Sequence, residues 1–205
     1  MEALWAWDCV STVDSVPMTL FVLTFDRVMQ MVKKLDILGS PRVRALEATI
    51  NDLEAQHGTW QVPWGEINRL QRIHGSEIDG EGRGAFSDDE PSLPVAGSPG
   101  PVGIVFNFYA RPQEGQKRRY GVAGHSYVGV VELGNPIRSS TVLQFGQSGD
   151  PQSPHWFDQA PLYAAGRFKR SPFTAEEVSN EASEPYHPGE PRSPSPPWEE
   201  PAAKP

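Results

Sequence analysis

The first third of the chain carries apolar residues at helical spacing. The segment Asp14-Ser15-Val16-Pro17 offers a side-chain acceptor followed by a first-turn proline, which is typical of a helix start. Broad apolar coverage then continues to Leu38, and Gly39 ends it. Ser40-Pro41 starts a second helix, which stops at Gly58 and whose apolar positions are Leu46, Ile50 and Leu53. The pattern predicts a helical region over 14–72, ending in a turn and a short helix.

Later in the chain the apolar positions alternate, as they do in strands. In residues 102–110 every second residue is apolar, so these side chains lie on one face of a strand. Residues 126–133 and 137–145 are β-branched and aromatic runs separated by Gly134-Asn135-Pro136, a hairpin signal. We therefore expect a mainly antiparallel sheet over 93–170, and an α+β fold in which the N-terminal helices pack on that sheet.

Two segments show neither the helical spacing nor the strand alternation of apolar residues. Residues 75–101 are rich in Gly, Ser, Asp, Glu and Pro, and predict a long acidic surface loop. Its acidic residues lack the spacing of an EF-hand loop, so a solvated face is preferred over a calcium site; they are Asp79, Glu81, Asp88, Asp89 and Glu90. After a short helix opened by Thr174, residues 179–205 form a Pro-rich tail that we expect to be disordered, leaving 1–178 as the folded part.

Composition narrows the possible partners. The 205 residues include 21 Pro and 19 Gly, and the apolar fraction of 38% predicts a modest core. The net charge of −8 argues against a nucleic-acid partner. The apolar run 18–25 is too short to span a membrane, and polar residues interrupt the first apolar run, so no secretory signal is predicted.

The most distinctive polar stretch is the loop that follows the second hairpin strand, residues 146–159. Its glycines and prolines fix turns, and its donors and acceptors crowd together. We expect His155, Asp158 and Gln159 to be hydrogen-bonding struts within it. Neither His125 nor His155 lies at a metal-ligand spacing, so no metal and no cofactor is predicted.

Several separated motifs occur in an order that resembles the C-terminal part of the large subunit of the penicillin acylase family. The closest resemblance is to the branch of acyl-homoserine lactone, aculeacin and cephalosporin acylases, and it covers roughly residues 3–178. The motifs are Leu4 to Asp8, Asp14-Ser15, Leu20-Phe21, Val62-Pro63-Trp64-Gly65-Glu66, Arg69-Leu70, Leu93 to Gly97, Gly124 to Val128, Val131-Glu132-Leu133, Gly146-Gln147-Ser148, Asp150-Pro151, Ser153-Pro154-His155 and Asp158-Gln159.

The resemblance implies a part of an αββα sandwich and hydrolysis of amides in acylated substrates, such as β-lactam antibiotics or acyl-homoserine lactones. In this N-terminal nucleophile (Ntn) hydrolase family a serine between Gly and Asn, exposed by self-cleavage, is the nucleophile. The three Gly-Ser pairs in this chain, at residues 39, 75 and 97, are followed by Pro, Glu and Pro. We therefore expect a fragment that is inactive alone and needs an upstream large-subunit portion and a small subunit as partners.

The resemblance also implies one supporting site residue, Glu132, at the place of a glutamate that orients a histidine near the nucleophile. The alternative is a plain ion pair between Glu132 and Arg138 near the strand ends.

Two functions of different classes remain open. One is the amide hydrolase fragment; the other is a noncatalytic remnant or interaction module, with the acidic Pro-rich tail as its contact segment. Members of the resembled family are usually periplasmic or secreted, whereas the N-terminal residues of this chain do not form a secretory signal. We therefore expect that Met1 does not begin a complete enzyme. The sequence assigns no compartment.

Overall fold

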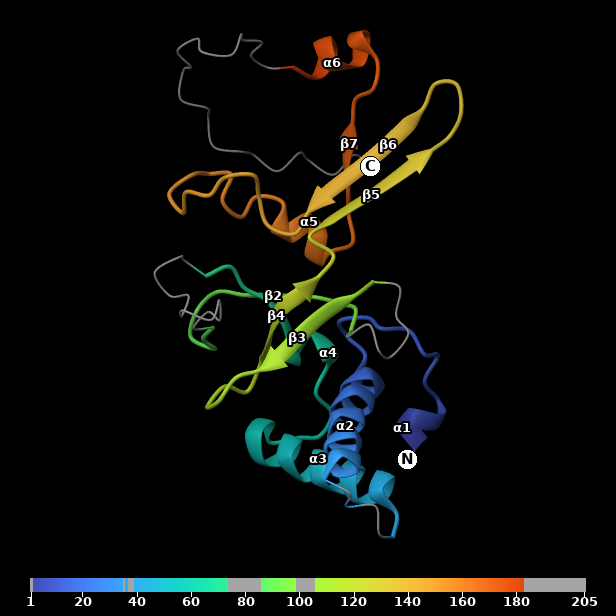
Figure 1. Ribbon diagram of the computed structural model, residues 1–205, viewed down its shortest axis with the longest axis vertical. Helices are drawn as coiled ribbons and strands as arrows, with labels where there is room; N and C mark the ends of the chain where they lie inside the picture. Colours follow the sequence, from blue (N-terminus) through green and yellow to red (C-terminus); the bar gives the residue numbers. More distant parts are fainter. Residues whose placement is uncertain (1, 35, 37–38, 74–85, 99–105, 183–205) are drawn as a thin grey trace. The chain divides into compact units, whose positions relative to one another are not determined.

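The computed structural model describes residues 2–34, 36, 39–73, 86–98 and 106–182 (Figure 1). The chain forms two compact units, residues 1–125 and 126–205. Each contains helices and strands, and antiparallel pairs predominate in both sheets, so the predicted α+β class is confirmed.

Among its described residues, the first unit contains the helices α1 (Glu2–Trp5), α2 (Val16–Lys33), α3 (Pro41–His57) and α4 (Trp64–Ile67). The start of α2 is as predicted, because the Ser15 side chain accepts a hydrogen bond from the Met18 N–H at 3.2 Å. Its end is not: α2 stops at Lys33, and the predicted end, Leu38, lies outside the described residues. Gly58 ends α3 in the left-handed conformation, with φ 74°.

The core of this unit lies around α2 and its junction with α3 and α4. Its buried members are Met18, Leu20, Val22, Leu53, Val62, Trp64 and Ile67. On α3 the buried face consists of Ala45, Thr49 and Leu53, so only one of the three predicted core positions is fully buried. Thr24 Oγ1 of α2 donates a hydrogen bond to Thr49 Oγ1 at 3.4 Å, and Leu46 and Ile50 pack against the core but are only partly buried.

The sheet of the first unit has the order β2-β1-β4-β3. It consists of β1 (Asn68–Leu70), β2 (Leu93–Pro94), β3 (Phe108–Pro112) and β4 (Arg119–Gly124). The sheet thus begins at Asn68 rather than at residue 93, because β1 pairs in parallel with β4. The predicted strand over 102–110 lies further along the chain as β3, and residues 102–105 are outside the described range.

The described end of the acidic loop, residues 86–98, is bound to the first unit. The Trp64 indole donates to the Gly97 carbonyl at 2.8 Å, and the Asn68 amide donates to the Val95 carbonyl at 2.7 Å. Asp88 is half-buried and accepts a hydrogen bond from the Tyr120 hydroxyl, so the predicted solvated face is wrong at this residue. Asp89 and Glu90 are exposed as predicted, and Asp79 and Glu81 lie outside the described residues.

The second unit is built on the sheet β5-β6-β7, with α5 (Ala160–Ala164) and α6 (Ala175–Glu181). Strands β5 (Tyr127–Glu132) and β6 (Arg138–Leu143) form the predicted antiparallel hairpin, and β7 (Lys169–Ser171) pairs with β6.

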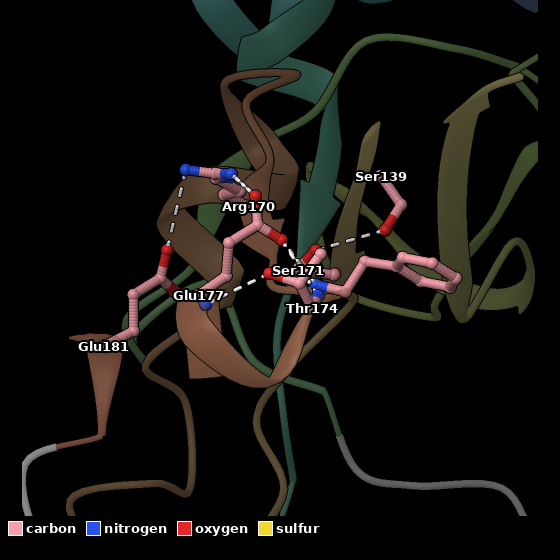
Figure 2. A network of polar contacts seen from close by, with 7 residues as sticks. Ser139, Arg170, Ser171, Thr174, Glu177 and Glu181 are labelled. Carbon is pink, nitrogen blue, oxygen red and sulfur yellow. Dashed lines mark hydrogen bonds and ion pairs between the residues drawn. The ribbon is translucent and has the colours of Figure 1, made fainter. Parts of the chain in front are cut away.

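Polar contacts join β6, β7 and α6 (Figure 2). The Ser139 hydroxyl donates to the Ser171 carbonyl at 3.2 Å, and Arg170 pairs with Glu177. Thr174 and Glu177 form a reciprocal capping box at the start of α6, as the Thr174 signal predicted. Helix α6 continues to Glu181, three residues into the predicted tail, and residues 183–205 lie outside the described range.

Candidate functional site

The candidate site combines the β5–β6 hairpin with the loop of residues 146–159, all within the second unit. The loop leaves β6 and enters α5, and its two ends are tied together. The Gln159 N–H donates to the Phe145 carbonyl at 2.8 Å, and the Phe145 and Phe157 rings stack 6.0 Å apart. This closure holds the intervening residues as one compact turn-rich segment.

Gln159 connects the loop to the sheet. Its side chain is 6% exposed, and its Oε1 accepts a hydrogen bond from the Leu143 N–H at 3.0 Å. Leu143 is the last residue of β6, so the amide side chain takes the place of a strand partner at the point where the ladder ends.

His155 and Asp158 form a pair inside the loop. The distance from His155 Nδ1 to Asp158 Oδ2 is 2.9 Å, and the side chains are 46% and 14% exposed. The other carboxylate oxygen, Asp158 Oδ1, is buried and has no hydrogen-bond partner within the described part of the chain. A carboxylate on Nδ1 fixes the orientation of the imidazole and directs Nε2 away from the pair.

The backbone around this pair leaves no room for a side chain at Gly146. A Cβ there would lie 2.1 Å from the His155 carbonyl oxygen and 2.6 Å from Asp158 Oδ1. The same carbonyl accepts a hydrogen bond from the Ser148 N–H at 3.1 Å. Gly146 therefore lies so close to the backbone of His155 that only glycine fits there.

The hydroxyl groups of the loop are engaged in its turns. Ser148 Oγ accepts from the Asp150 N–H at 3.0 Å, and Ser153 Oγ accepts from the His155 N–H at 3.2 Å. Both are turn-forming bonds of the kind that serines make two residues along the chain. In chemical terms the loop offers an oriented imidazole and a buried carboxylate oxygen.

Glu132 lies at the far end of the hairpin from this loop. It pairs with Arg138 directly across the two strands, with 3.9 Å between Oε2 and Nη1, and both side chains are about 70% exposed. The geometry is that of the ion pair considered as the alternative to a catalytic role. A pair as exposed as this contributes little to stability, about 0–1 kcal/mol, so the carboxylate is available for another partner. The structure does not bring Glu132 together with His155.

The sequence did not single out Gly146 as a close-packed position, although the Gly-Gln-Ser stretch was visible. A glycine followed by turn residues predicts a turn; only the fold shows which backbone atoms face it. Within the described residues, no cluster of three or more His, Cys, Asp and Glu side chains could hold a metal ion, and no helix there is long and apolar enough to cross a membrane.

The family match settles what kind of chain this is. The penicillin amidase family model matches residues 1–180, which include the hairpin and the whole 146–159 loop. This chain belongs to the penicillin amidase family. Acyl-homoserine lactone acylase PvdQ of Pseudomonas putida is similar, with 30% identity over 111 residues. That alignment covers 53% of this chain and 14% of the relative, so the chain spans only a small part of the relative's length.

Proposed function

We propose that this chain is the C-terminal part of the large subunit of an Ntn-type amide hydrolase that acts on acylated substrates, such as acyl-homoserine lactones or β-lactam antibiotics. In this proposal it supplies the scaffold and the 146–159 loop, and another polypeptide supplies the nucleophilic serine. Its partners would be an upstream large-subunit portion and a small subunit.

One observation carries the proposal: the penicillin amidase match extends over residues 1–180, yet none of the three Gly-Ser pairs in the chain is followed by Asn. The match supports an amide hydrolase, and the residues after each serine argue against a nucleophile within these 205 residues. The serine hydroxyls of the candidate loop accept hydrogen bonds that form its turns, which supports a structural role for these serines.

The experiment compares the chain alone with the chain supplemented by the nucleophile-bearing part and small subunit of a penicillin amidase family enzyme. Alone, it should keep its intact mass, take no label from a serine-directed acylating probe and hydrolyse no acyl amide in a panel. Supplemented, it should raise turnover above that of the added polypeptides. A shortened mass with a new N-terminal serine, together with turnover by the chain alone, would overturn the proposal.

Within that assembly we assign Glu132 a positioning role towards a histidine near the nucleophile. The assignment rests on the family resemblance; the exposed contact with Arg138 is weak enough for Glu132 to change partner at little cost in stability. Glu132→Gln should lower kcat of the supplemented enzyme and shift its pH profile, while Arg138→Gln leaves both unchanged. Equal effects of the two substitutions would identify a structural ion pair instead.

A noncatalytic interaction module is the second candidate. It is favoured by strand β5, which lies at an edge of its sheet and exposes Tyr127, Val130 and Val131 by 56–58%. Exposed apolar edges bind other chains. If the supplemented chain binds the added polypeptides but never raises turnover, the module is the better description.

A further inference from the structure

A polar pocket in the first unit lies between helices α2 and α3 and the turn that joins β3 to β4. Its volume is about 250 Å³, just below the range of about 300–1,000 Å³ typical of sites for drug-sized ligands. Ten of its fourteen lining residues are polar or charged, four of them basic and two acidic. The lining therefore carries a formal charge of +2 in a chain whose net charge is −8. This local reversal of charge suits a small anion.

Both acidic side chains of the lining are already paired with a basic one. Asp52 pairs with Arg27, and Asp26 Oδ2 accepts a hydrogen bond from Arg119 Nη1 at 2.5 Å. These two pairs neutralise each other's charges within the wall of the pocket. The excess positive charge of the lining therefore comes from its two remaining basic residues, Lys117 and Arg118.

Asp88 holds the turn that carries these two residues. The Lys117 N–H donates to Asp88 Oδ2 at 2.6 Å, and Arg118 Nη1 donates to the Asp88 carbonyl at 3.1 Å. The Asp88 carboxylate also interacts electrostatically with Arg118 and offsets part of its charge. The Lys117 ammonium, in contrast, has no ion-pair or hydrogen-bond partner among the residues that the structure describes. Its backbone is thus fixed while its charge is left for a ligand.

The pocket also offers neutral donors. Gln116 Oε1 accepts a hydrogen bond from the Asp88 N–H at 2.7 Å, so the group that Gln116 can present to a ligand is its amide NH₂. Gln30 of α2 and Gln56 of α3 also line the pocket, and their side chains make no hydrogen bond within the described part of the chain. Ammonium, guanidinium and amide donors from three elements favour an anion with three or more acceptor oxygens over a carboxylate with two.

We propose that the polar pocket binds a phosphate dianion, either as inorganic phosphate or as the phosphate group of a small phosphomonoester. Lys117 supplies the uncompensated charge, Arg118 adds guanidinium donors, and Gln116 adds a neutral donor. The inference requires no reaction, so it stands or falls independently of the amide hydrolase proposal.

The test titrates the 205-residue chain by calorimetry at about pH 7.5 and constant ionic strength with glycerol phosphate, inorganic phosphate, methanesulfonate and acetate. A phosphomonoester is then mainly a dianion, because its second pKa is about 6. We expect one saturable phosphate site per chain. Methanesulfonate, a tetrahedral monoanion, and acetate should bind about tenfold more weakly or less, as for loss of a charge-assisted hydrogen bond.

The two phosphate compounds distinguish the sources of the ligand. Tighter binding of glycerol phosphate would support a phosphomonoester, and binding of inorganic phosphate alone would support the free ion. Absence of saturable binding by both compounds would overturn the proposal and leave the pocket as a solvated network of ion pairs. Equal binding of phosphate and methanesulfonate would also overturn it.

Two pairs of variants locate the site, and circular dichroism checks that each variant is folded. Lys117→Gln removes a charge but no side-chain contact, and should weaken phosphate binding by about tenfold or more. Lys33→Gln makes the same change outside the lining and should bind normally. Gln30→Glu places a negative charge in the lining and should also weaken binding, whereas Gln61→Glu, outside it, should not. Equal effects within either pair would show that phosphate responds to the general surface charge, and would refute the assignment.

Discussion

The Tyr120 hydroxyl donates a hydrogen bond to Asp88 Oδ1 at 2.7 Å, which joins β4 to the 86–98 segment. The second carboxylate oxygen accepts from the Lys117 N–H at 2.6 Å, and the Phe86 and Tyr120 rings stack 5.2 Å apart. A residue from the acidic loop is thus held both by the turn that precedes β4 and by the strand itself.

Replacing Tyr120 by Phe should lower the free energy of unfolding by about 1 kcal/mol at neutral pH, because Asp88 loses a donor. Burial is the largest single influence on the pKa of Asp88 and raises it, but the hydrogen bonds from Tyr120 and from the backbone of Lys117 and Arg118 outweigh it, so this pKa lies below its ordinary value. A lowered pKa contributes stability that is complete above about pH 4 and is lost as the pH falls through the folded-state value. The difference between wild type and variant, measured in urea titrations, should therefore shrink below about pH 4. Tyr127→Phe, at an exposed tyrosine, is the control; a pH-independent difference at Tyr120 would contradict this account.

Gly146→Ala should destabilise the second unit by about 1–3 kcal/mol or more, because the new Cβ meets backbone that cannot move aside. Gly149→Ala, in the same loop, places its Cβ where no atom lies within 4 Å, and should change stability by less than about 0.5 kcal/mol. Thermal melts measure the stabilities of the two variants. Equal stabilities would show that the loop is not closed as described.

Asp158→Ala should lower stability by about 1–3 kcal/mol through loss of the contact with His155. Asp150→Ala, on the exposed part of the loop, should have a smaller effect. If the supplemented enzyme with Asp158→Ala melts normally but loses turnover, the pair acts in catalysis and the strut interpretation is wrong.

Alkaline unfolding should depend on Tyr163. Burial raises the pKa of this residue to about 12, so the folded state retains a proton that the unfolded chain releases near pH 10. The corresponding stability is complete below about pH 10 and is lost as the pH rises towards the folded-state pKa. In Tyr163→Phe the stability of the second unit should decline less steeply between pH 10 and 12, followed by circular dichroism. An unchanged slope would show that Tyr163 is not the responsible group.

The exposed edge strand β5 should make the isolated chain associate. Val131→Lys places a charge on that edge and should raise the monomer fraction in sedimentation experiments, as lysines do on natural edge strands. Val10→Lys, at a similarly exposed position outside the strand, should not. A monodisperse wild-type monomer that binds no hydrophobic dye would refute the prediction.

The sequence predicted what local patterning determines. Ser15 begins α2 and Gly58 ends α3 through interactions within a few residues. The β5–β6 hairpin needs only a short turn between its strands. It did not predict β1, because Asn68–Leu70 is short, contains two polar residues and becomes a strand by pairing with β2 and β4, which both lie far along the chain.

The α3 core face was misplaced for a related reason. Hydrophobicity favoured Leu46 and Ile50, whereas the buried positions beside Leu53 are Ala45 and Thr49, and Thr49 accepts a hydrogen bond from Thr24 of α2. At the candidate site, the sequence marked His155, Asp158 and Gln159 as polar residues in a tight loop. His155 and Asp158 pair with each other three residues apart, but the partner of Gln159 is the last residue of β6, which no spacing encodes.

The parallel pairing of Asn68 and Arg69 with Arg119 and Tyr120 has a consequence for how the first unit assembles. The α2–α3 hairpin and the β3–β4 pair can form from neighbouring segments, but the sheet is complete only when β1 finds a strand made much later in synthesis. Closing that long loop costs chain entropy before any contact repays it. We therefore expect docking of β1 to be the late, rate-limiting event in folding. The α2–α3 hairpin should form before that event.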